Sequence, residues 1–166
     1  MNFDKYTIKA QELLQKAADV AAGNGQQAIE TGHLLKGILL TDENVMTFLI
    51  KKLGISQQLL ENKLEELLGG YPKVSGQQPY LSNDSASALQ RAEKELKTFG
   101  DEFIAVEHVI LGLLTGKDKT ASILKDTGFD KNHLIEAIKE LRGGDTVTDQ
   151  NAESKYRSLE RYSNNL

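Results

Sequence analysis

The sequence contains no cysteine and no tryptophan, and only two of its 166 residues are proline. Without cysteine the chain cannot form a disulfide framework, use a thiol nucleophile or bind zinc or iron through thiolates. No apolar run approaches the roughly 18 residues that span a bilayer, and the N-terminus lacks the apolar segment of a signal peptide. We therefore expect a cytoplasmic protein with no membrane partner.

The sequence also lacks a strong excess of charge of either sign. The chain has 20 Lys and Arg against 24 Asp and Glu, a formal net charge of −4, and it has no basic block. A protein that holds nucleic acid through its phosphates is therefore disfavoured. The stretch 112–118 approaches a phosphate-binding loop, but it has one residue too few between its glycines and Asp where Ser or Thr would hold magnesium. We expect no nucleotide site and no cofactor in this chain.

The histidines give little support to a catalytic or metal site. They are His33, His108 and His133, and they occur in no HExxH or HxxxH pattern. His33 and His108 each precede an apolar helical stretch, which is typical of a histidine that bonds locally near a helix start. No serine lies in a GxSxG turn, and no pair of carboxylates is singled out for acid–base work. The sequence therefore predicts no catalytic residue, although a small hydrolase using His108 and Glu107 is an alternative.

An internal repeat is the most informative feature of the chain. At a spacing of 75 residues, identical residues recur at Leu14 and Leu89, Gly25 and Gly100, Ile29 and Ile104, His33 and His108, and Gly37 and Gly112. After a gap of one residue the spacing becomes 74, and identical residues recur at Lys51 and Lys125, Gly54 and Gly128, Leu60 and Leu134, and Gly69 and Gly143. The chain is thus one unit of about 70 residues written twice.

Each unit predicts four helices, because apolar residues recur at helical spacing between capping residues and glycines. We expect an all-α fold of two four-helix repeats, about eight helices in all, related by a pseudo-twofold axis and forming one domain. The first repeat covers 1–70 and the second 81–144, and 71–80 is the connector that holds both prolines. From 145 to 166 the chain turns polar and is expected to be a tether. The seam between the repeats is the natural place for a groove.

Four polar residues lie where this plan brings the repeats together. Thr7 and Ser82 precede the first helix of each repeat, while Asp101 and Glu107 flank an apolar stretch at the entry to a later helix. All four also suit ordinary structural roles, as helix caps, a loop acid and an acid facing a helix dipole.

Taken together, these features resemble a known family. The 75-residue duplication, FIAVEH at 103–108 before an LGLL helix, and a last helix ending in ELRGG resemble the Clp amino-terminal double-repeat domain of Clp/Hsp100 AAA+ unfoldases. The resemblance covers 1–144. The sequence VTDQNAE at 147–153, with Tyr156, Leu159, Tyr162 and Leu166 after it, resembles the linker to the first ATPase module in the ClpB type of disaggregase.

The resemblance implies the function and the site. The parent would be a hexameric ATPase that works with the DnaK system, using ATP and magnesium in modules absent from this chain. The domain itself would bind unfolded or aggregated polypeptide weakly through an apolar groove and pass it to the ATPase ring, and it would be monomeric. The implied client-contacting residues are Thr7, Ser82, Leu89, Asp101, Glu107 and His108, where His108 replaces the apolar residue usual in the ClpB type.

Two alternatives from other classes stay open. The domain could instead dock adaptors or degradation signals, as in the ClpC and ClpA types of protease-linked unfoldase. In the ClpC type a glutamate commonly precedes the histidine in both repeats, whereas here copy one has Gly32 before His33 and only copy two has Glu107 before His108. A purely structural duplicated bundle, which binds nothing, is the remaining alternative.

Overall fold

The computed structural model describes residues 3–42, 44–74 and 78–156. Within these residues the structure contains nine α-helices, two short 3-10 helices and two strands of two residues each. The predicted all-α fold of two four-helix repeats is confirmed. No helix in the described part of the chain is long and apolar enough to cross a membrane.

The helices of the first repeat are α1 (Ile8–Gly23), α2 (Thr31–Thr41), α3 (Val45–Leu53) and α4 (Gln57–Gly69). Their ends follow from local chemistry. The Thr7 hydroxyl accepts a hydrogen bond from the Ala10 N–H at 3.1 Å and caps α1. Gly54 ends α3 with a positive φ of 69°, a conformation that costs glycine little.

The helices of the second repeat are α5 (Asn83–Lys94), α6 (Leu96–Phe99), α7 (Val106–Leu114), α8 (Lys119–Thr127) and α9 (Lys131–Arg142). The stretch 83–99, expected as the first of four helices in this repeat, is divided into α5 and α6 at Glu95. There the Glu95 N–H bonds the Ala92 carbonyl at 3.1 Å, an i to i−3 bond that tightens the last turn of α5. The division accounts for nine helices instead of eight.

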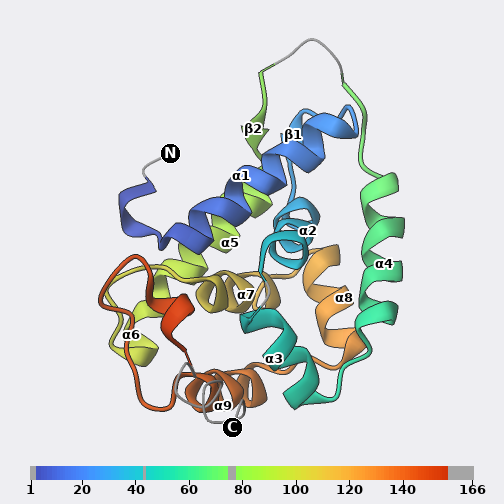
Figure 1. The fold of residues 1–166 in the computed structure, drawn as a ribbon. Coiled ribbons are helices and arrows are strands. Elements are labelled where there is room, and N and C mark those ends of the chain that lie inside the picture. Colours follow the sequence, from blue (N-terminus) through green and yellow to red (C-terminus); the bar gives the residue numbers. More distant parts are fainter. Residues whose placement is uncertain (1–2, 43, 75–77, 157–166) are drawn as a thin grey trace, which may run out of the picture.

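The two repeats pack reciprocally, as a pseudo-twofold axis requires. Helix α1 packs along α2 as α5 packs along α7, while α3 of the first repeat meets α9 and α4 meets α8 (Figure 1). Strand β1 (Ala28–Ile29) runs parallel to β2 (Tyr80–Leu81). The equivalent contact on the other side is a parallel bridge between Tyr6 and Ile104. Each repeat thus lends the segment before its first helix to the other.

The close packing of the paired helices requires a glycine at one position in each repeat. A Cβ added at Gly37 would lie 2.5 Å from the carbonyl oxygen of Leu13 on α1. A Cβ added at Gly112 would lie 2.2 Å from the carbonyl oxygen of Ala88 on α5. Both distances are far shorter than van der Waals contact. Glycine therefore occurs at this position of both repeats because the backbones of the paired helices approach closely there.

Residues 145–156 differ from the expected tether, because they fold back onto the domain. They include the 3-10 helix η2 (Ala152–Lys155), and Val147, Ala152 and Tyr156 are buried. The Ile8 N–H donates to the Gln150 carbonyl at 2.8 Å, which ties this segment to the start of α1. Of the residues named in the predicted tether, Leu159, Tyr162 and Leu166 lie outside the described residues.

Candidate functional site

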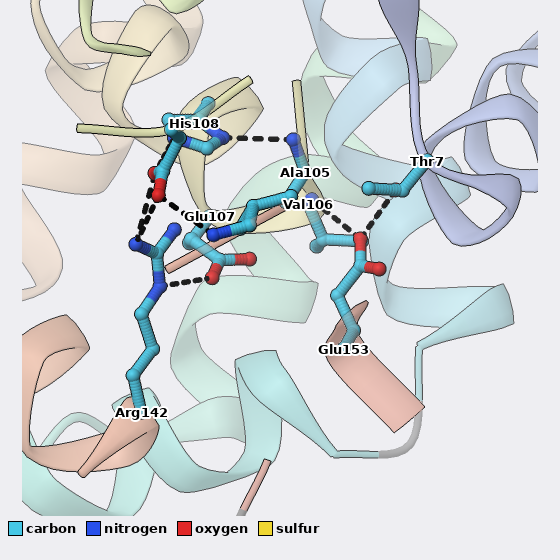
Figure 2. Close-up of polar contacts among 9 residues, drawn as sticks. Thr7, Ala105, Val106, Glu107, His108, Arg142 and Glu153 are labelled. Atoms are coloured by element: carbon cyan, nitrogen blue, oxygen red, sulfur yellow. Dashed lines mark hydrogen bonds and ion pairs between the residues drawn. The ribbon is translucent and has the colours of Figure 1, made fainter. Parts of the chain in front are cut away.

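A buried polar cluster in the second repeat holds most of the residues marked by the sequence (Figure 2). His108 stands in the first turn of α7, and its Nδ1 accepts the Ala105 N–H at 2.8 Å. Its Nε2 therefore carries the ring hydrogen and donates to Asp101 Oδ2 at 2.6 Å. Both side chains are fully buried. The prediction of a locally bonded histidine near a helix start is confirmed.

Arg142, at the end of α9, neutralises the carboxylates of this cluster. Its Nη1 lies 3.0 Å from Asp101 Oδ1 and 2.9 Å from Oδ2, and its Nε donates to Glu107 Oε2 at 3.0 Å. Burial alone would lower the pKa of Arg142, but Glu107, Tyr156 and Asp101 outweigh it and leave the pKa raised. For Asp101, burial opposes ionisation, yet the bonds from His108 and the Val147 N–H together with Arg142 leave its pKa lowered. Both groups are therefore charged.

Glu153 reaches the same cluster from the segment after the second repeat. Its Oε2 accepts hydrogen bonds from the Thr7 hydroxyl at 2.5 Å and from the Val106 N–H at 3.1 Å. Burial, and then the nearby Glu107 carboxylate, raise the pKa of Glu153 to about 7. Glu153 was not among the predicted site residues, because it was marked only as the last residue of the stretch 147–153 that resembles a linker.

The six predicted residues fall into two groups. The structure brings Thr7, Asp101, Glu107 and His108 into the cluster and buries their side chains. It leaves Ser82 apart, as the half-buried cap of α5 that accepts from the Ser85 N–H at 3.1 Å. Leu89 is 6% exposed, in the core of α5. Each residue thus has a structural partner, and the role of all six in client contact stays a prediction.

The catalytic candidates of the cluster, Glu107 and His108, do not face solvent or a cleft. Glu107 and His108 are fully buried, and they bond to Arg142 and Asp101 rather than face a cleft. In the part of the chain that the structure describes, no group of three or more His, Asp or Glu side chains is arranged to hold a metal ion. The arrangement is that of an ion-pair network that holds elements together.

The surface between the repeats carries a groove where α4 meets α8. Its cavity is about 450 Å³ and is lined by Lys63, Glu66, Leu67, Gly70, Tyr71, Lys119, Ser122 and Ile123. Three of these, Leu67, Tyr71 and Ile123, are apolar or aromatic and partly buried against the core. The groove therefore has an apolar floor and a charged rim of both signs.

A groove between the repeats was predicted with Leu89 in it and with Thr7, Ser82, Asp101, Glu107 and His108 as the other client-contacting residues. None of these six residues lines the groove between α4 and α8. The sequence repeat indicates that helices of the two repeats meet in equivalent pairs. Which helices form those pairs, here α4 with α8 and α3 with α9, is decided only by the tertiary structure. The pseudo-equivalent surface, where α3 meets α9, also forms a hollow of about 610 Å³. Charged residues dominate that second hollow, and Lys52 and Glu140 bridge it as an ion pair at 2.9 Å.

Relatives of the chain agree with this architecture. The chain is 45% identical to the chaperone protein ClpB of Bacteroides thetaiotaomicron and 40% identical to that of Porphyromonas gingivalis, in both cases over all of this chain and 19% of the relative. The chain thus spans about a fifth of the length of these curated relatives.

Solved structures resemble the fold at low sequence identity. The Hsp104 N-terminal domain from Candida albicans matches with a TM-score of 0.76 and 20% identity, over 90% of this chain and 99% of that one. A ClpV N-domain solved in complex with a VipB peptide matches with a TM-score of 0.65 and 15% identity, over 81% of this chain and 85% of that one.

A family model identifies the fold from the sequence. The model of the Clp repeat (R) N-terminal domain matches residues 5–127, which include the reciprocal helix pairs α1–α2 and α5–α7. The identified domain agrees with the two packed repeats, and the matched part of the chain holds no ATPase module. The chain belongs to the Clp repeat (R) N-terminal domain family.

Proposed function

We propose that this chain is the client-binding accessory domain of a ClpB-type, ATP-dependent protein disaggregase. It engages unfolded or aggregated polypeptide and passes it to a hexameric ATPase ring that works with the DnaK system. The support is the 45% identity to a ClpB chaperone over the whole chain. ATP and magnesium belong to the modules of the parent that lie outside this chain.

The groove between α4 and α8 is the observation that carries the proposal. It combines partly buried apolar side chains with an open, charged rim at the seam of the repeats. Such a surface accepts apolar segments of many sequences, because it makes few demands on shape. The rim carries Lys63, Lys119 and Glu66, so it tolerates clients of either charge.

The expected affinity is weak. Burying roughly 300 Å² of apolar surface at about 25 cal/mol/Å² contributes on the order of 7 kcal/mol. Association costs of about 4–15 kcal/mol offset most or all of that gain. One domain therefore binds at micromolar affinity or weaker and releases quickly. Several tethered copies on one ring recover strength through a high effective concentration.

The predicted residues act from beneath the surface in this conformation. Thr7, Asp101 and Glu107 are buried and bond to Glu153, His108 and Arg142 respectively, so substituting them would weaken client binding only by perturbing the fold. They enter the proposal as positioning residues. Leu89 and His108 stand in the same relation, whereas Ser82 is half-exposed and available for direct contact.

The test compares one substitution in the groove with a matched control. In Ile123→Asp a charge replaces a partly buried apolar residue of the α4–α8 groove, and in Leu53→Asp it does so in the α3–α9 hollow. We expect Ile123→Asp to weaken binding to a labelled, permanently unfolded protein about tenfold, measured by fluorescence anisotropy, and Leu53→Asp to leave it unchanged. Circular dichroism melts establish that both variants fold. Equal binding by Ile123→Asp and the unsubstituted chain would remove the groove from the proposal.

A second candidate function is the docking of one defined partner peptide. The ClpV N-domain similar in fold to this chain was solved with a VipB peptide, which favours recognition of a short segment by this architecture. Tight, stoichiometric binding to the peptide segment of one partner protein, with no affinity for the unfolded protein, would select this alternative.

A further inference from the structure

Residues 145–156, which we call the strap, cover the buried cluster of the second repeat. Val147, Ala152 and Tyr156 are at most 5% exposed, and the Glu153 residue is 2% exposed. In Figure 2 Glu153 points toward Thr7 and the start of α7. The strap thus closes a surface that contains ionised groups.

Hydrogen bonds to the backbone fix the strap on both sides. The Glu102 N–H donates to the Val147 carbonyl at 2.8 Å, and the Val147 N–H donates to Asp101 Oδ1 at 2.8 Å. Further along, the Gln150 carbonyl accepts the Ile8 N–H at 2.8 Å. These bonds replace water on groups that would be solvated if the strap left, so each bond contributes only a small net free energy to docking.

The charges beneath the strap do not balance locally. Three buried carboxyl groups, on Asp101, Glu107 and Glu153, share one guanidinium, and Arg142 forms its ion pairs with the first two. Glu153 receives only neutral donors, and in the described part of the chain no basic side chain lies within ion-pair distance of it. A buried carboxylate with no cation costs far more free energy than the same group as a neutral carboxylic acid.

Unpartnered atoms point to the same place. Among the described residues, Glu107 Oε1, Glu153 Oε1, Arg142 Nη2 and the Tyr156 hydroxyl are buried without a hydrogen bond. The groups that face Glu153 are Glu107 from α7, Thr7 from before α1 and Tyr156 from the strap. Arg142 from α9 lies over the Tyr156 ring at 5.7 Å. None of these faces Glu153 with a compensating positive charge at bonding distance.

We propose that the strap docks reversibly, staying closed while the Glu153 carboxyl holds a proton and opening when that carboxyl ionises. The proposal goes beyond client binding and does not depend on it. Opening would uncover Thr7 and Asp101, two of the predicted client residues. It would also free the twelve residues from 145 to 156 to extend away from the domain, a reach of about 40 Å when extended.

The direction of the pH dependence follows from burial. The docked pKa of Glu153 is about 7, raised above the value of 4.5 that an exposed glutamate has. Docking is therefore fully favoured below the exposed value and is lost as pH rises through the docked value. Between about pH 5 and about pH 7.5 the docking equilibrium should fall by tenfold or more.

Amide hydrogen exchange tests the strap directly. We expect the protection of the Val147 and Ile8 amides, corrected for the intrinsic exchange rate, to fall roughly tenfold or more from about pH 5 to about pH 7.5. In Glu153→Gln, a neutral side chain of the same shape, the protection should be flat with pH. Glu140→Gln, which neutralises an exposed carboxylate paired with Lys52, should retain the dependence of the unsubstituted chain.

Two results would overturn the proposal. The first is protection in the unsubstituted chain that does not change over this pH range. The second is a folded Glu153→Gln variant that keeps the full pH dependence. If Glu153→Gln does not fold, the profile of the unsubstituted chain decides alone, and Tyr156→Phe, which removes the buried hydroxyl but keeps the ring, serves as the second strap variant and should keep the dependence.

Discussion

The two repeats share one backbone arrangement around a buried histidine, but the side chain that accepts from this histidine is neutral in one repeat and charged in the other. In the first, His33 Nδ1 accepts the Glu30 N–H at 2.9 Å and Nε2 donates to the neutral Gln26 at 2.6 Å. In the second, His108 makes the same two bonds, but its Nε2 partner is the ionised Asp101. The hydrogen-bond geometry is therefore a property of the repeat, whereas the charge belongs to each copy.

Neighbouring positions complete the difference. Gly32 of the first repeat leaves room for Tyr71, whose hydroxyl accepts the Gly32 N–H at 3.2 Å and whose ring lies 5.1 Å from that of His33. Glu107 stands at the equivalent position of the second repeat. Leu68 and Arg142 are equivalent at the end of the last helix. The histidine of the first repeat is thus packed against an aromatic ring, whereas that of the second lies in an ion-pair network covered by the strap.

Removing the cation should produce the largest effect. Arg142→Leu places the residue of the first repeat in the second and leaves Asp101 and Glu107 buried without it. We expect a loss of about 3–5 kcal/mol in the free energy of unfolding, measured by urea denaturation. The triple variant Asp101→Gln, Glu107→Met and Arg142→Leu removes all three charges and should recover most of the loss. If the triple variant is no more stable than Arg142→Leu, the network is not held by charge.

The glycine pair should come second. Gly112→Ala should cost about 3 kcal/mol because its Cβ would meet the α5 backbone. Gly37→Ala should cost less, because its Cβ would lie 2.5 Å from the Leu13 carbonyl instead of the 2.2 Å found at Gly112. Thermal melts of both variants provide the measurement. Equal stability of both variants and the unsubstituted chain would show that the paired helices can separate freely. Gly69→Ala, with nothing near its Cβ, is the control.

The smallest of the expected effects is a loss of stability in acid that comes from the histidine of the first repeat. Burial lowers the pKa of His33 to about 4, below the 6.5 of an exposed histidine. Stability from the neutral ring is therefore present above the exposed value and lost as pH falls toward the buried one. The loss should be about 2 kcal/mol between about pH 7 and about pH 5, opposite in sign to the Glu153 contribution. His33→Gln should abolish this component in urea denaturation at several pH values, and a pH profile identical to that of the unsubstituted chain would contradict it.

Much of the fold could be predicted from the sequence because its signals are local or repeated. Thr7 and Ser82 were expected as helix caps and cap α1 and α5, and the glycine at 54 ends α3. The division at Glu95 was not predicted, because helix-forming residues surround it on both sides. The groove residues Leu67 and Ile123 were not predicted either, since each is unremarkable on its own helix.

The sequence by itself determined the duplication, the helical class and the helix ends marked by caps or glycines, because these signals act through the repeat or over a few residues. Only the tertiary structure decided which charges are buried together. Asp101, Glu107, Arg142 and Glu153 meet across as many as 52 positions of the chain. The cost of burying a carboxylate depends on that encounter, because a cation or a proton must come from whatever residue the fold brings near.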